Sequence, residues 1–219
     1  MKKYQFEMNE ELFSYVKRPI RKKQDMILLL AHTIKFLIIT PLGENNKVQA
    51  NKQLIVYVDK MSRLLFCVEN KIFTFNFPLR IYNDIELGNF LSISYRGFLK
   101  IDNIVSSLLI SIFSQEDIFE NTLENIENSI LEKAIENEWE QLDIEEIRKF
   151  IVHLMTFEPG YLRYEYDKEN ANGVLHPEHH LDFFFSSDNT MKIGLDDIID
   201  ADWMIDMLNT LTACKYIKN

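Results

Sequence analysis

Glycine, proline and cysteine are scarce in this sequence. Its 219 residues include only 6 Gly, 5 Pro and 2 Cys. Few glycines and prolines argue against a sandwich built on many tight turns, and favour longer helices joined by a small number of loops. The two cysteines, Cys67 and Cys214, form no C-x-x-C pair, so neither a zinc ribbon nor a redox motif is predicted. We expect both to be reduced thiols.

Long hydrophobic runs are also missing. The most apolar stretch, 26–39, is interrupted by polar side chains and by Lys35, whereas a membrane helix needs about 20 apolar residues. Lys2 and Lys3 are followed by a polar and acidic segment, so no secretory signal is predicted. The sequence therefore predicts a soluble cytoplasmic protein with no membrane contact.

Several catalytic signatures are absent as well. The sequence contains no P-loop, no G-x-G-x-x-G, no G-x-S-x-G and no H-E-x-x-H. Each of these motifs carries a particular chemistry, so their absence removes the enzyme classes that depend on them. Hydrophobic residues make up 47% and charged residues 26%, which are globular values. We predict no cofactor and leave open whether the chain is an enzyme.

Short runs rich in β-branched and aromatic residues recur between Gln53 and Tyr95. Such runs are typical of strands, and they predict a three- or four-stranded antiparallel meander, although the first run also fits a helix. A hairpin is predicted later in the chain, from two strands at about 161–167 and 179–186. The runs of the meander are Leu54–Val58, Leu64–Val68, Ile72–Phe77 and Leu91–Tyr95.

Helices are predicted both before and after this meander in the sequence. Asn9, followed by two glutamates, is typical of a helix start, and a second helix is expected from about Arg21 into the 30s. Asp102, Ser114 and Asp143 are expected to open three more helices, and a last one is expected over 195–211. The predicted fold class is α+β: an antiparallel β-sheet with a segregated group of helices and a C-terminal helix.

No repeat or low-complexity linker interrupts the chain, which favours a single domain over 1–219. Within it we distinguish a meander part at about 1–100, a helical part at about 102–157, and a β-hairpin plus helix at about 160–219.

Negative charge is concentrated in one segment. The net charge is −10, and residues 115–147 hold twelve acidic side chains against one basic residue, Lys133. Such an acidic helix is either a solvated face or a surface for a basic protein or a second copy. A basic segment at 17–23 is its counterpart. This segment could contact the phosphates of nucleic acid, or dock on the acidic helix of the same molecule or of a second copy. No aromatic residues are interleaved with its bases, so it is weak evidence for nucleic acid.

The segment 160–185 differs from the rest of the chain. His176, His179 and His180 fall within five residues, and Asp182 follows. Since successive side chains of a strand point to opposite faces, pairing of the two strands would gather one set of titratable groups on a single face. That set is Arg163, Glu165, Asp167, His180 and Asp182.

Three interpretations of this hairpin remain open. Imidazole and carboxylate groups suit a metal such as zinc, manganese or iron, although the spacing matches no zincin motif. Metal-free acid–base chemistry would use His180 as base and Arg163 as phosphate clamp. A purely structural hairpin would pair the same groups with one another. The candidate site residues are Arg163, Asp167, His176, His180 and Asp182.

The strand Leu162–Asp167, the segment His176-Pro-x-x-His-Leu181 and the amphipathic C-terminal segment together resemble a bacterial family over about the last 60 residues. That family is catalogued as a domain of unknown function, with an R-x-D-Y-D-like strand and an H-P-x-x-H-L segment; Glu165 replaces the usual aspartate. The resemblance implies a bacterial cytoplasmic protein carried on mobile or defence-related islands, and no activity.

From these observations we expect an interaction, regulatory or accessory component of a defence or toxin-type system. Its partner would be another protein or a second copy of the chain. The alternative is a histidine-dependent nuclease or other hydrolase, metal-assisted or not, that uses the hairpin 163–182.

Overall fold

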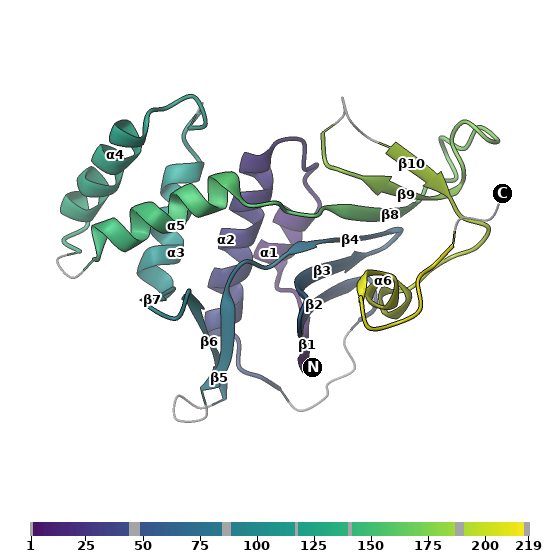
Figure 1. The fold of residues 1–219 in the computed structure, drawn as a ribbon, viewed down its shortest axis with the longest axis horizontal. Helices are drawn as coiled ribbons and strands as arrows, with labels where there is room; N and C mark the ends of the chain where they lie inside the picture. Colours follow the sequence, from purple (N-terminus) through teal and green to yellow (C-terminus); the bar gives the residue numbers. More distant parts are fainter. Residues whose placement is uncertain are drawn as a thin grey trace. The chain divides into compact units, whose positions relative to one another are not determined.

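The computed structural model confirms the α+β class, with antiparallel sheets, a group of helices and a C-terminal helix (Figure 1). None of the helices in the described part of the chain has the length and hydropathy that crossing a bilayer requires. The structure describes residues 2–43, 49–84, 89–116, 118–139, 142–186 and 191–216.

The chain divides into two compact units, and each unit is built from segments that are distant in the sequence. The first unit comprises 1–8, 47–77 and 159–219, and the second comprises 9–46 and 78–158. The proposed single domain over 1–219 stays a prediction, and the units are described in turn.

The first unit holds a seven-stranded sheet in the order β1-β2-β3-β4-β8-β9-β10, in which every neighbouring pair is antiparallel. The first three predicted runs form β2, β3 and β4, so the helical alternative for the first run is wrong. The strands are β1 (Lys2–Glu7), β2 (Lys52–Val58), β3 (Ser62–Val68), β4 (Lys71–Asn76), β8 (Leu162–Tyr166), β9 (His179–Phe183) and β10 (Met191–Gly194).

The strand predicted over 179–186 ends earlier, at Phe183. Phe184 has φ 68°, in the left-handed region that strands do not use, so the backbone leaves the sheet there. The chain then returns to pair β10 with β9. The strand β10 itself was not predicted.

Helix α6 (Ala201–Leu208) covers one face of this sheet. Met204 and Ile205 pack there against a buried cluster that includes Leu65, Tyr164 and Leu181. Asp200 caps the helix by accepting a hydrogen bond from the Trp203 amide. Because strand side chains alternate, the neighbours of Tyr164 and Leu181 on β8 and β9 face away from α6. This alternation decides where the polar side chains of the hairpin lie.

Within its described residues, the second unit combines five helices with a three-stranded sheet in the order β5-β6-β7. The predicted strand Leu91–Tyr95 is part of β6, so it belongs to this sheet and not to the meander. The elements are α1 (Glu10–Val16), α2 (Lys23–Ile39), β5 (Arg80–Asp84), β6 (Phe90–Tyr95), β7 (Leu99–Lys100), α3 (Asn103–Phe113), α4 (Leu123–Glu136) and α5 (Ile144–Thr156).

Helix caps account for most of the predicted helix starts. The side chains of Asn9, Asp102 and Asp143 each accept a hydrogen bond from a backbone amide of the following turn, as predicted. The prediction that Ser114 opens a helix is wrong. The Ser114 amide donates to Ile110 O, so Ser114 closes α3, and the next helix starts only after Thr122, whose side chain accepts from the Asn125 amide.

Candidate functional site

A cluster of polar side chains lies where β8, β9 and β10 pair. The register places Arg163 opposite Asp182, and Glu165 opposite His180. Lys192 of β10 lies on the other side of Asp182. These five side chains, which we call the 163–192 cluster, share the sheet face that points away from α6. The shared face predicted for Arg163, Glu165, His180 and Asp182 is therefore present.

Asp182 lies at the centre of the cluster, with a side chain only 1% exposed. Its Oδ2 accepts hydrogen bonds from Arg163 Nε, at 3.1 Å, and from Arg163 Nη2. Its Oδ1 lies 2.9 Å from Lys192 Nζ. Burial opposes ionisation, but the hydrogen bonds and charges of Lys192 and Arg163 outweigh it and lower the pKa of Asp182. Asp182 is therefore a carboxylate at neutral pH.

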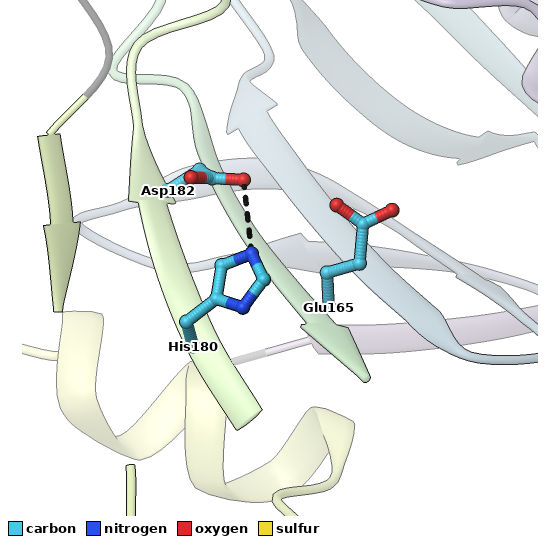
Figure 2. Close-up of side chains that lie close together, drawn as sticks. All are labelled: Glu165, His180 and Asp182. Carbon is cyan, nitrogen blue, oxygen red and sulfur yellow. Dashed lines mark ion pairs between the residues drawn. The ribbon is translucent and has the colours of Figure 1, made fainter. Parts of the chain in front are cut away.

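His180 is fully buried beside Asp182 (Figure 2), and its two ring nitrogens have different partners. Nδ1 lies 2.8 Å from the carbonyl oxygen of Pro177, which can only accept, so Nδ1 carries the proton. Nε2 lies 2.9 Å from Lys192 Nζ, an ammonium that can only donate, so Nε2 is an acceptor. The lone pair of Nε2 thus accepts from Lys192, and Nε2 lies 3.6 Å from Asp182 Oδ2.

Gly194 allows the loop before β9 to reach His180. A Cβ at this position would lie 2.8 Å from Pro177 Cγ, closer than real Cβ atoms approach other heavy atoms. Only glycine lets Pro177 pack on β10, and this packing holds the Pro177 carbonyl against His180.

The remaining predicted site residues lie beside the 163–192 cluster. His176 Nε2 is 3.3 Å from Asp167 Oδ2, so these two form a pair of their own just beyond β8. The His176 ring meets the His180 ring edge-on at 4.9 Å. His179 points to the opposite face, where its Nδ1 lies 2.9 Å from the hydroxyl of Tyr164. His176 and Asp167 thus border the cluster, and His179 is not part of it.

Two lysines of the site were missed in the sequence. Lys192 lies on a four-residue strand whose alternation is too short to give a strand signal. Lys71 of β4 pairs in register with Glu165. Burial lowers the pKa of Lys71, with Glu165 opposing this and Arg163 adding to it.

The oxygen and nitrogen ligand atoms of Glu165, His180 and Asp182 all lie within 4.8 Å of one another. They are the side chains of the cluster that can coordinate a metal ion. Figure 2 shows Glu165 on the neighbouring strand, facing the His180 and Asp182 pair. Arg163 Nη2 lies 3.2 Å from Glu165 Oε2, so the guanidinium bridges both carboxylates of the cluster.

A second candidate site is the exposed side of α4. Leu123, Glu127, Leu131 and Ile135 follow one another at intervals of four, which puts them in one row. The three apolar members are 53%, 40% and 77% exposed. We call this row the α4 stripe. Ile126 and Ile130 are buried on the other side of the helix, so Ile126 is not available to a partner.

Acidic side chains flank the α4 stripe, as the charge distribution predicts. Glu124, Glu127, Glu132 and Glu136 are exposed on this helix, while Asp117 and Glu140 of the acidic segment lie outside the described residues. The exposed residues of the basic segment, in the same unit, are Lys17, Arg18, Arg21 and Lys22. Lys23 is half-buried, and its ammonium donates to the Phe157 carbonyl.

The chain matches no known protein family, no curated protein and no solved structure. The resemblance over the last 60 residues therefore stays a prediction.

Proposed function

We propose that the protein acts by binding another protein rather than by catalysis, and that the α4 stripe is its docking surface. The observation that carries this proposal is the exposure of Leu123, Leu131 and Ile135 in one row of a helix whose other face is buried. Helices of this kind bind partner proteins by placing their apolar row in a hydrophobic groove of the partner.

The pairing inside the 163–192 cluster supports a non-catalytic role. His180 and Asp182 are 0% and 1% exposed, and both are engaged by Lys192. A general base must come within hydrogen-bond reach of its substrate. A base with no exposed surface, whose acceptor nitrogen already receives a hydrogen bond, is poorly placed for this.

The charges favour a second copy of the chain as the partner. The acidic α4 and the exposed bases of 17–23 are present on every copy, so two copies can pair them reciprocally and close a dimer. Surface ion pairs add little affinity, so apolar contact must supply most of it.

The second unit offers an apolar complement for the α4 stripe. A groove of about 340 Å³ is lined mainly by apolar side chains of α2 and β6, Ile39 and Phe90 among them. Its charged residues are Lys100 and Asp102, and Asp102 is engaged as the cap of α3. Lys100 would meet the acids of α4.

The assignment of this protein to a defence or toxin-type system rests on the resemblance alone.

The proposal is tested by the mass of surface variants in solution. Leu131→Ser combined with Ile135→Ser should leave the fold intact, because both side chains are exposed, and should dissociate the dimer. Ile198→Ser is the matched control, since Ile198 is 69% exposed but lies in the first unit. A monomeric wild type, or a dimer that the double variant does not weaken, would overturn the proposal.

A hydrolase is the second candidate, because Glu165, His180 and Asp182 converge beside Arg163. Carboxylate and imidazole groups with a guanidinium are the parts needed to hold and cleave a phosphodiester. Labelled RNA and DNA incubated with the protein, with and without divalent ions, distinguish the candidates. Cleavage that disappears in His180→Ala and persists in His179→Ala would replace the first proposal by this one.

A further inference from the structure

We propose that Glu165, His180 and Asp182 form a binding site for a divalent transition-metal ion, and that the Lys192 ammonium occupies the cation position in this structure. The inference goes beyond protein binding and rests on a different part of the molecule.

The geometry of the two buried ligands fits a shared ion. His180 Nε2 and Asp182 Oδ2 are 3.6 Å apart, and two ligands at about 2.1 Å from one tetrahedral zinc lie about 3.4 Å apart. The third ligand, Glu165, has a side chain 31% exposed, so it can rotate to shorten its distance, which is at most 4.8 Å. Little movement of the buried atoms is needed.

The tautomer of His180 is the one that a metal ligand requires. Metal-bound imidazoles usually donate their other N–H to a carbonyl or carboxylate, which fixes the ring and directs the lone pair at the ion. Here the Nδ1–H of His180 donates to the Pro177 carbonyl at 2.8 Å. The close packing of Pro177 on Gly194 holds that carbonyl in place.

Lys192 shows that a cation is stable at this position. Its Nζ lies 2.9 Å from His180 Nε2 and 2.9 Å from Asp182 Oδ1, so it engages two of the three ligands. The Lys192 side chain is 31% exposed, and its flexible stem can carry the ammonium into solvent. Lysine and metal ion would therefore compete for His180 Nε2 and for the Asp182 carboxylate, whose other oxygen, Oδ2, accepts from Arg163.

The donor set selects the kind of ion. One imidazole and two carboxylates suit Zn²⁺ or Mn²⁺, whereas Mg²⁺ and Ca²⁺ prefer oxygen ligands alone. Arg163, which pairs with both carboxylates, remains beside the ion and offsets part of their charge. We therefore expect Zn²⁺ to bind better than Mg²⁺.

The test is calorimetric titration of the full-length protein with Zn²⁺. Wild type should bind one ion, and Lys192→Met should bind it about tenfold more tightly or better, because the contacts of the Lys192 ammonium with His180 and Asp182 no longer have to be broken first. His180→Ala should weaken binding by more than about 100-fold, because the loss of an outer-shell partner alone costs about 10–100-fold. Glu165→Gln removes the charge of a ligand whose side chain is 31% exposed, and should weaken binding without threatening the fold.

His179→Ala is the control, because His179 is the next residue on β9 and points to the opposite face. Its affinity for Zn²⁺ should equal that of wild type. Two results would overturn the proposal. One is that neither wild type nor Lys192→Met binds Zn²⁺ or Mn²⁺. The other is that His179→Ala lowers the affinity while His180→Ala and Glu165→Gln leave it unchanged.

Discussion

Arg163 and Asp182 lie directly opposite each other on β8 and β9, and the guanidinium donates two hydrogen bonds to one carboxylate oxygen. Asp182→Ala should lower the free energy of unfolding by about 3 kcal/mol, because it leaves the positive charges of Arg163 and Lys192 without their shared partner. The double variant Arg163→Met/Asp182→Leu should lose less, since it removes the pair together. Urea unfolding measures both, and equal losses would contradict this account of the pair.

Gly194 and Pro177 are predicted to be coupled. Gly194→Ala would place its Cβ 2.8 Å from Pro177 Cγ, and such an overlap should destabilise the protein by about 1–3 kcal/mol. Adding Pro177→Ala removes the obstructing ring atom and should recover part of the loss. Gly43→Ala is the control, because no atom lies within 4 Å of its added Cβ. Thermal unfolding that is unchanged in Gly194→Ala would contradict the close packing.

His32 of α2 is predicted to make the protein less stable in acid. It is 8% exposed and stacks on Tyr15 at 3.5 Å. Burial lowers its pKa; Glu11 opposes this, and Lys35 and Arg18 add to it. The unfolded chain, with an ordinary histidine pKa of about 6.5, therefore binds the proton more readily than the folded chain.

The His32 contribution should thus be complete above about pH 6.5 and should be lost as the pH falls below that value. His32→Phe keeps the ring stack and removes the titration. Its melting temperature should fall less than that of wild type between neutral pH and about pH 5. Parallel melting curves for the two proteins would show that His32 is not responsible.

Cys67 is predicted to be unreactive in the folded protein. It is 5% exposed, and burial raises the pKa of its thiol to about 12, with Asp200 and Asp202 adding to the shift and Lys3 opposing it. The thiolate is the reactive form, so modification should be very slow. Exposed Cys214 should react rapidly with a thiol reagent, and Cys67 only after denaturation. Rapid reaction of folded Cys214→Ser would contradict the burial of Cys67.

The period of two in the strands made four of the five side chains of the 163–192 cluster predictable. Alternation alone placed Arg163, Glu165, His180 and Asp182 on one face. The place of Lys192 could not be predicted, because it depends on the pairing of β10 with β9. A strand of four residues is too short to give an alternating sequence pattern that would indicate this pairing. The pairing of His176 with Asp167 depends likewise on how the connecting loop folds.

Helix starts were predictable where a cap and an apolar periodicity coincide, as at Asp102 and Asp143. The prediction that Ser114 opens a helix was wrong. A serine followed by acidic residues is typical of a helix start, but the Ser114 amide donates to Ile110 O at the end of α3. The strand β1 was missed because it lies at the edge of the sheet, and of its described residues only Phe6 is buried. A single buried residue gives no strand pattern.

The central claim, that the protein works by association, is tested most directly by the molar mass of the wild-type chain in solution. Light scattering should give the mass of a dimer at low salt, and the dimer should weaken at high salt, because screening removes the attraction between α4 and the basic segment 17–23. A monomeric mass at both low and high salt would contradict the claim.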